Sequence, residues 1–82
     1  GVNGTGFTGK DIYITAVTNS TSNDTYVTLY DLTGSPAGQQ KVPQKSATSF
    51  PTPLGPFKNF FIPSNHYPTD GVAVFYVLVD KD

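Results

Sequence analysis

The longest uninterrupted apolar segment of this chain begins after Gly71, runs from Val72 to Val79 and ends at Asp80. Most of its residues are β-branched or aromatic, so it predicts a β-strand rather than a helix. Residues of both parities in this segment are hydrophobic, whereas a half-buried strand alternates apolar with polar side chains. The segment therefore predicts a strand that is covered on both faces.

The composition of the whole chain favours an all-β fold. Glu, Arg and Met, which are good helix formers, are absent, whereas Thr, Val, Tyr and Phe are frequent. Eight Gly and seven Pro divide the 82 residues into short segments. We therefore expect a single domain over residues 1–82, built as a small antiparallel sheet, sandwich or partly open barrel of about five or six short strands.

The first third of the chain predicts an arm and a hairpin. Residues 1–9 contain four glycines and are expected to form a flexible or docking arm. Residues 10–18 and 25–33 alternate as strands, with Ile12, Ile14 and Ala16 sharing one face of the first. The polar turn residues between them predict an antiparallel hairpin, which we expect to form the centre of the fold together with the terminal strand.

The middle of the chain is polar and interrupted by prolines. Residues 39–45 contain Pro43 and predict a short edge strand, and residues 46–50 predict another short strand. Residues 51–56 hold three prolines, which lack an N–H, so we interpret them as an extended connector that crosses the domain. Residues 57–62 are rich in aromatic side chains and predict a further strand.

Several function classes are disfavoured by composition. Without cysteine the chain forms neither disulfides nor thiolate zinc sites, and one histidine is too few for an all-protein transition-metal site. A net charge of −1 without arginine argues against nucleic-acid binding. No apolar segment of the sequence approaches the roughly 20 residues of a membrane helix.

Catalysis is not expected. Ser64, His66 and Asp70 supply the residue types of a hydrolase triad, but they lie in one loop, and neighbours in one loop seldom adopt triad geometry. The absence of Glu also disfavours paired carboxylates of the glycosidase type. We interpret the chain as a non-enzyme without a cofactor.

Calcium binding and glycosylation are weaker alternatives. Oxygen ligands occur in two groups, Asn19, Asn23 and Asp24, and Asp70, Asp80 and Asp82, but neither has the spacing of a dedicated calcium loop. Turn capping explains these residues more simply, so no metal site is expected. Glycosylation sequons begin at Asn3, Asn19 and Asn23, and such triplets arise by chance in a chain rich in Asn and Thr.

The aromatic side chains have two interpretations, a sugar-stacking platform or a patch that a partner covers. Sugar platforms commonly use Trp, which is absent, so a partner patch is favoured. The hairpin and Phe60 supply enough apolar residues to cover one face of the terminal strand, whereas the polar segment 34–56 does not supply a second layer. The candidate interface residues are Phe57, Phe60, Phe61, Ile62, Val74, Tyr76 and Leu78.

The chain is expected to be secreted or displayed at the cell surface. It begins at Gly1 rather than Met, which suggests that a secretion signal has been removed. A surface rich in Ser and Thr, without thiols or thioethers, suits an oxidising exterior.

The segments 6–17 (GFTGKDIYITAV) and 26–31 (YVTLYD), with the terminal strand, resemble the globular β chain of split type IV pilins, of the geopilin or short-pilin-chaperone type. The resemblance covers about half the chain. It implies a non-catalytic structural subunit of an extracellular filament, in which a secreted β domain docks its apolar sheet face on a short helical pilin chain. The alternatives are a secreted carbohydrate-binding or adhesin module and a viral surface subunit.

Overall fold

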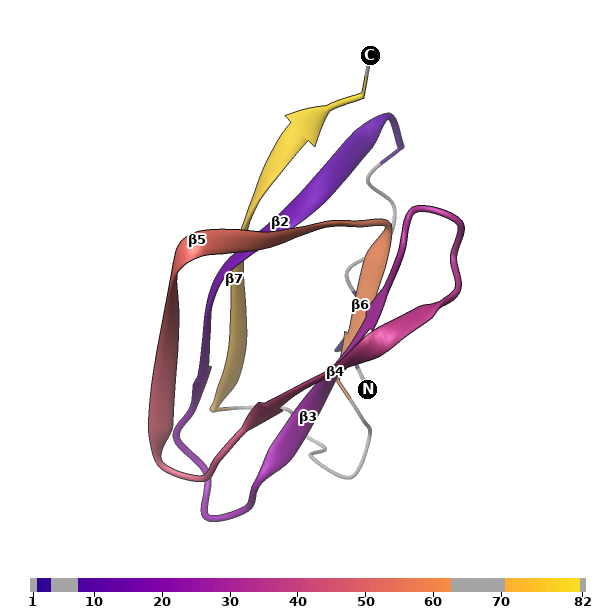
Figure 1. The fold of residues 1–82 in the computed structure, drawn as a ribbon. Coiled ribbons are helices and arrows are strands. Elements are labelled where there is room, and N and C mark those ends of the chain that lie inside the picture. The colour runs from indigo at the N-terminus through magenta and orange to yellow at the C-terminus, as the bar shows by residue number, and fades with distance from the viewer. Residues whose placement is uncertain (1, 4–7, 63–70, 82) are drawn as a thin grey trace.

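The structure, a computed structural model, describes residues 2–3, 8–62 and 71–81. Over these ranges the chain forms two antiparallel sheets that face each other as a small sandwich, which confirms the all-β prediction (Figure 1). None of the described residues belongs to a helix that is long and apolar enough to cross a membrane.

The described strands are divided between two sheets, and of the successive strands only β3 and β4 lie in the same sheet. Sheet A has the order β1-β6-β3-β4 and sheet B the order β5-β2-β7. The outermost strands are therefore β1 and β4 in sheet A, and β5 and β7 in sheet B. In chain order the described strands are β1 (Val2–Asn3), β2 (Lys10–Asn19), β3 (Thr25–Tyr30), β4 (Pro36–Val42), β5 (Ser46–Phe57), β6 (Asn59–Ile62) and β7 (Val72–Asp80).

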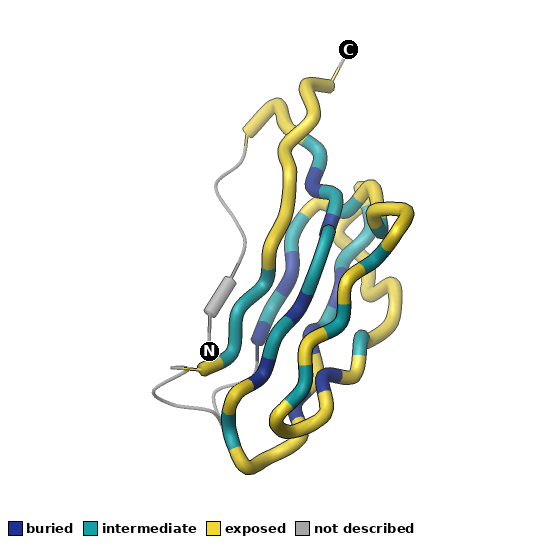
Figure 2. The backbone as a smooth tube through the Cα atoms, turned by 90° about the vertical axis from the view of Figure 1, so that its left-hand side faces the viewer, coloured by how far each residue is buried: buried dark blue, intermediate teal, exposed yellow. Residues whose placement is uncertain are grey.

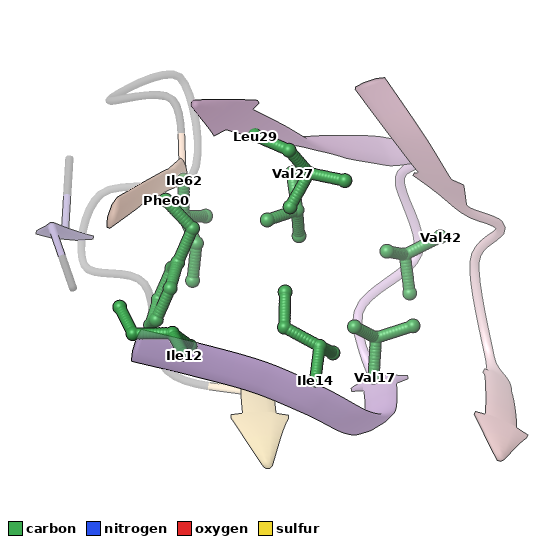
Figure 3. Packing of buried hydrophobic residues seen from close by; sticks show 8 residues of the cluster. All are labelled: Ile12, Ile14, Val17, Val27, Leu29, Val42, Phe60 and Ile62. Atoms are coloured by element: carbon green, nitrogen blue, oxygen red, sulfur yellow. The ribbon is translucent and has the colours of Figure 1, made fainter. Parts of the chain in front are cut away.

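The core lies between the two sheets, and this chain supplies both sides of it. From sheet B, three residues of β2 point inward, and from sheet A five residues of β3, β4 and β6 meet them (Figure 3). All eight side chains are at most 6% exposed. Among the described strands, those of sheet A cover one face of sheet B, and none forms a second layer over its other face, as expected from the polar segment 34–56. These core residues are Ile12, Ile14, Val17, Val27, Leu29, Val42, Phe60 and Ile62.

The loop between β2 and β3 connects the two sheets, so the predicted hairpin is wrong. β2 pairs with β5 and β7, whereas β3 pairs with β4 and β6. Asn19, the last residue of β2, is 1% exposed and its Nδ2 donates to the carbonyl oxygens of Asn23 (2.8 Å) and Val42 (3.0 Å). Because buried amides require partners, these bonds hold the crossing in place.

A β-bulge in β2 changes which of its residues face the core. The register with β7 shifts between Ile14 and Ala16, which leaves Thr15 as the additional residue. Thr15 Oγ1 donates a hydrogen bond to the carbonyl of Phe75 at 3.2 Å. The next buried residue after Ile14 is consequently Val17, whereas strict alternation predicts Ala16.

The proline-rich segment is part of a strand as well as a connector. β5 includes residues 51–56 and pairs irregularly with β2, and the chain then crosses over to β6 in sheet A (Figure 1). Since β5 is an edge strand, its prolines interrupt no ladder on the outer side. β4 is also an edge strand, as predicted for residues 39–45.

The two ends of the described chain lie at sheet edges. Val2 and Asn3 pair with Ile62 and Phe61 of β6, whereas residues 1 and 4–7 of the expected arm lie outside the described residues. The terminal strand β7 occupies an edge of sheet B, although its sequence predicts a central strand. The centre of sheet B is β2.

Candidate partner-binding surface

β7 has one half-buried end and one exposed end. Val72 and Val74 pack against the core, but each residue from Phe75 to Val79 is between 39% and 52% exposed (Figure 2). The prediction of a strand covered on both faces is therefore wrong for the chain on its own. The structure instead leaves a stretch of five consecutive large apolar side chains accessible to solvent.

The exposure on the inner face arises because sheet A is too short to cover it. The first residues of β2 and the last residues of β7 extend beyond the other strands (Figure 1). Tyr76 pairs with Ile14 and its ring lies 5.8 Å from that of Phe60 at a tilt of 53°. Leu78 pairs with Ile12 and shares its face, yet 40% of Leu78 is exposed.

The outer face of sheet B carries a shallow apolar groove. Val77 pairs with Tyr13 of β2, so the two side chains lie on the same outer face. The groove has a volume of about 360 Å³ and only one residue with a polar side chain besides Tyr13. Its described lining residues are Tyr13, Thr52, Pro53, Val77 and Val79. Apolar surface that is gathered in this way is typical of a site that a partner covers.

Charged residues mark the protruding end of this surface. Lys10 forms an ion pair with Asp80, and Lys81 Nζ lies 3.7 Å from Asp11 Oδ1. Both pairs join β2 to the end of β7 or to the residue that follows it. Because the lysines are 43% and 44% exposed, the pairs contribute little to stability, and their main effect is to neutralise this end of the sheet.

The residues predicted for the interface fall into three places. Phe60 and Ile62 are buried in the core, 5% and 3% exposed, and Phe57 packs against the core from β5. Phe61 is half-buried in sheet A. Val74, Tyr76 and Leu78 lie on the inner face of β7, where exposure increases toward the end of the strand.

The outer-face residues Phe75, Val77 and Val79 were missed as candidates. The sequence pattern separates the two faces of β7 correctly, but it cannot show which face looks toward sheet A. The exposed fractions of these three side chains are 52%, 48% and 46%. The signal that identifies the outer face is the register with β2, because these three residues pair with half-buried rather than buried positions of β2.

Two of the side chains proposed as calcium ligands near the β2–β3 loop, those of Asn19 and Asp24, already bind the protein. Asn19 Oδ1 accepts hydrogen bonds from Thr21 N (2.9 Å) and Thr21 Oγ1 (2.6 Å). Asp24 Oδ1 accepts one from Gln44 N at 2.9 Å. These contacts are those of turn capping. Attaching a glycan to Asn19 Nδ2 in the folded chain would replace one of its two N–H groups, and so remove one of the hydrogen bonds to Asn23 O and Val42 O.

A second hollow, of about 440 Å³, lies where β2 ends and β5 begins, and it is lined by Thr18, Asn19, Ser20, Lys45, Ser46 and Ala47. Its one charged group is engaged, since Lys45 Nζ donates to the carbonyl of Ser20 at 2.8 Å. Within the part of the chain that the structure describes, no three His, Cys, Asp or Glu side chains gather as a metal site would require. Ser64, His66, Asp70 and Asp82 lie outside the described residues.

Asp31 organises the turn between β3 and β4. Hydrogen bonds hold the pKa of Asp31 below its ordinary value, first that from the Thr33 hydroxyl and then that from the Ser35 N–H at 3.0 Å. These bonds favour the ionised carboxylate. The Asp31 carboxylate stabilises this turn and is not among the residues that line the groove on sheet B.

Comparisons with protein-family models, curated proteins and solved structures found no match for this chain.

Proposed function

We propose that this chain is a non-catalytic structural subunit of an extracellular, type IV pilus-like filament, in which sheet B docks on a short helical partner chain. The observation that carries the proposal is the exposed apolar end of β7, where five consecutive large apolar residues are about half accessible. Burying such surface drives association at roughly 25 cal/mol per Å² of apolar area.

The outer face of sheet B is the part of this surface that suits a helix. The groove between Tyr13, Pro53 and Val77 is open along its length and apolar, so it can accept a row of apolar side chains from one face of an amphipathic helix. The ion pairs at its end keep unpaired charge away from the groove. The helical nature of the partner rests on the resemblance of residues 6–17 and 26–31 to split pilins.

The groove is a poorer fit to the alternative of a carbohydrate-binding or adhesin module. A sugar site requires polar groups placed to bind hydroxyls. Apart from the Tyr13 hydroxyl, the described groove lining offers one such side chain, Thr52. A viral surface subunit would use the same apolar burial, so the form of the assembly is what distinguishes it from a filament subunit.

Immunogold labelling with negative-stain electron microscopy of native material tests the filament proposal. Antibodies raised against the folded chain should decorate extracellular filaments at regular intervals. Labelling of closed shells, or recovery of all the protein as a free monomer in the medium, would overturn the proposal. Val77→Asp should weaken docking on the helical partner, because Val77 lines the groove. Tyr26→Asp is the matched control, because Tyr26 is also exposed but is not among the residues that line the groove.

A further inference from the structure

Asn23 lies in the loop between β2 and β3 and begins one of the N-x-S/T triplets of the sequence. The residue is exposed, and the hydrogen bonds described for it use its main chain. Asn23 O accepts from Asn19 Nδ2 (2.8 Å) and Thr21 Oγ1 (3.0 Å), and Asn23 N donates to Thr21 Oγ1 at 3.3 Å. The side-chain amide of Asn23 can therefore be modified without the loss of a described contact.

The structure distinguishes Asn23 from the other two sequons. Asn19 is 1% exposed, and its Nδ2 donates to the carbonyl oxygens of Asn23 and Val42. A sugar on that nitrogen would replace one of these N–H groups at a buried position, where a carbonyl that loses its partner is costly. The triplet that begins at Asn3 includes residues 4 and 5, which lie outside the described residues. Of Asn19 and Asn23, only Asn23 has room for a glycan in the folded chain.

Thr25, the third residue of the Asn23 triplet, carries a hydroxyl that none of the described contacts uses. The residue is 2% exposed and lies on the same face of β3 as the core residues Val27 and Leu29. Its Oγ1 is buried and has no hydrogen-bond partner among the described residues. A buried hydroxyl without a partner destabilises a protein, whereas valine has the same branched shape and no polar atom. Stability alone therefore favours valine at position 25.

We propose that Asn23 is an N-glycosylation site and that Thr25 is retained because a glycosyltransferase recognises its hydroxyl. Transfer of a glycan to an asparagine requires a hydroxyl two residues further along the chain. This requirement gives the Thr25 hydroxyl a role that valine cannot perform. The donor class is an oligosaccharide that is linked to a lipid phosphate or diphosphate.

The transfer joins the Asn23 amide to the first sugar of the donor. A bond forms between Asn23 Nδ2 and the anomeric carbon, and the bond from that carbon to the lipid phosphate oxygen breaks. The lipid phosphate leaves with the bonding electron pair, and one amide proton passes to a base of the transferase. The product amide keeps one N–H and is uncharged.

The burial of Thr25 sets the order of modification and folding. A transferase cannot reach a hydroxyl that is buried in the folded chain, so the glycan is added before β3 packs against the core. After folding, the glycan stays in solvent, because Asn23 is exposed.

The modified loop lies far from the candidate partner-binding surface. The loop between β2 and β3 and the C-terminal end of β7 are at opposite ends of the molecule (Figure 1). A glycan on Asn23 therefore leaves the exposed end of β7 uncovered. The modification requires the export that is expected for this chain, but it requires neither a filament nor a helical partner.

Mass spectrometry of the protein from its native source tests the site. Trypsin, which cleaves after Lys10 and Lys41, releases a peptide of residues 11–41 that contains both Asn19 and Asn23. Electron-transfer fragmentation should locate one glycan on Asn23 and none on Asn19. A peptide of unmodified mass, or a glycan on Asn19 with Asn23 unmodified, overturns the proposal. The result is the same for a filament, a shell or a monomer, so it is independent of the filament proposal.

Thr25→Ser and Thr25→Val form the matched pair of variants. Both keep Asn23, but only serine keeps the hydroxyl, so in the native host Thr25→Ser should retain the glycan and Thr25→Val should lose it. Produced in a host without the transferase, Thr25→Val should melt at least about 4 °C above the original chain, because it lacks the buried hydroxyl. A glycan on Thr25→Val, or no rise in its melting temperature, overturns the role assigned to the hydroxyl.

Discussion

The two outer strands of sheet B pair with the same neighbour, β2, yet they differ in how they meet solvent. β5 has prolines at 51, 53 and 56, and it crosses to the other sheet. β7 has no proline, is regular, and exposes apolar side chains at its C-terminal end. An edge that carries prolines discourages further pairing, whereas an apolar edge without them favours it. The difference indicates that the prolines of β5 discourage the addition of a further strand, whereas the sequence of β7 does not.

The largest loss of stability should come from a substitution in β2, the central strand with which both β5 and β7 pair. Ile14 is 1% exposed and pairs with Leu54 of β5 and Tyr76 of β7. Ile14→Ala should lower the free energy of unfolding by about 2–5 kcal/mol, because it removes a buried side chain and leaves a cavity. Urea unfolding measures this loss. Val77→Ala, on the exposed side of β7, should change stability by no more than about 0.5 kcal/mol, and a comparable loss there would contradict the difference in burial.

Asn19 stabilises the end of sheet B at which β5 and β7 both begin. This residue pairs with Ser46 of β5 and Val72 of β7, and its amide satisfies main-chain groups of the crossing loop. Asn19→Ala should cost about 2–3 kcal/mol, since buried main-chain groups lose their partners. Thermal unfolding of Asn23→Ala provides the control, because Asn23 contributes its main-chain oxygen rather than its side chain to Asn19. Equal melting temperatures for Asn19→Ala and the unmodified chain would contradict the role of the buried amide.

The attachment of β5 to β2 should be sensitive to a single methyl group. A Cβ at Gly55 would lie 2.6 Å from the Ile12 carbonyl oxygen and 2.8 Å from Tyr13 Cδ1. Gly55→Ala should therefore destabilise the chain by about 1–3 kcal/mol through overpacking, as measured by urea unfolding. Pro53→Ala, at an exposed position of the same strand, is the matched control and should have a smaller effect. A neutral Gly55→Ala would show that β5 is held more loosely than β7.

The smallest effect should be the acid response of the β3–β4 turn, which lies outside sheet B. The pKa of Asp31 is lowered, so the stability that its ionised form contributes is present above the ordinary value of 3.8 and is lost as pH falls through the lowered pKa. Asp31→Asn should reduce the part of the acid dependence that lies below pH 3.8. Melting temperature as a function of pH measures it. An unchanged acid limb would contradict the effect of the Thr33 and Ser35 hydrogen bonds.

The sequence predicted the strands better than it predicted their partners. The pattern of residues 10–18 and 25–33 located β2 and β3, and alternation correctly placed Ile12 and Ile14 on the same face, which is the core face. It could not distinguish a hairpin from a crossing between sheets, because a polar loop serves both. Val42, at the end of a polar strand, gave no periodic signal although it is fully buried.

The candidate surface was predicted only in part. An apolar pattern on both faces identified β7 as a strand that needs cover, but a continuous pattern is the same for a buried central strand and for an edge strand that binds a partner. The strand order β5-β2-β7 shows that β7 is an edge strand, and the register with β2, including the bulge at Thr15, shows which face of β7 is exposed. Neither can be read from the sequence pattern of β7. Phe60 and Ile62 were also predicted as interface residues, but they are apolar because they pack in the core of this chain.

The central claim is that the outer face of β7 is exposed in the isolated chain and buried in the native assembly. Because the chain has no cysteine, Val77→Cys introduces a single thiol whose alkylation rate measures access. In the isolated chain at low concentration, Val77→Cys should react rapidly and Val27→Cys, at a fully buried position, slowly. In the native assembly, Val77→Cys should become about as slow as Val27→Cys. Rapid alkylation of Val77→Cys in the assembly would contradict the claim.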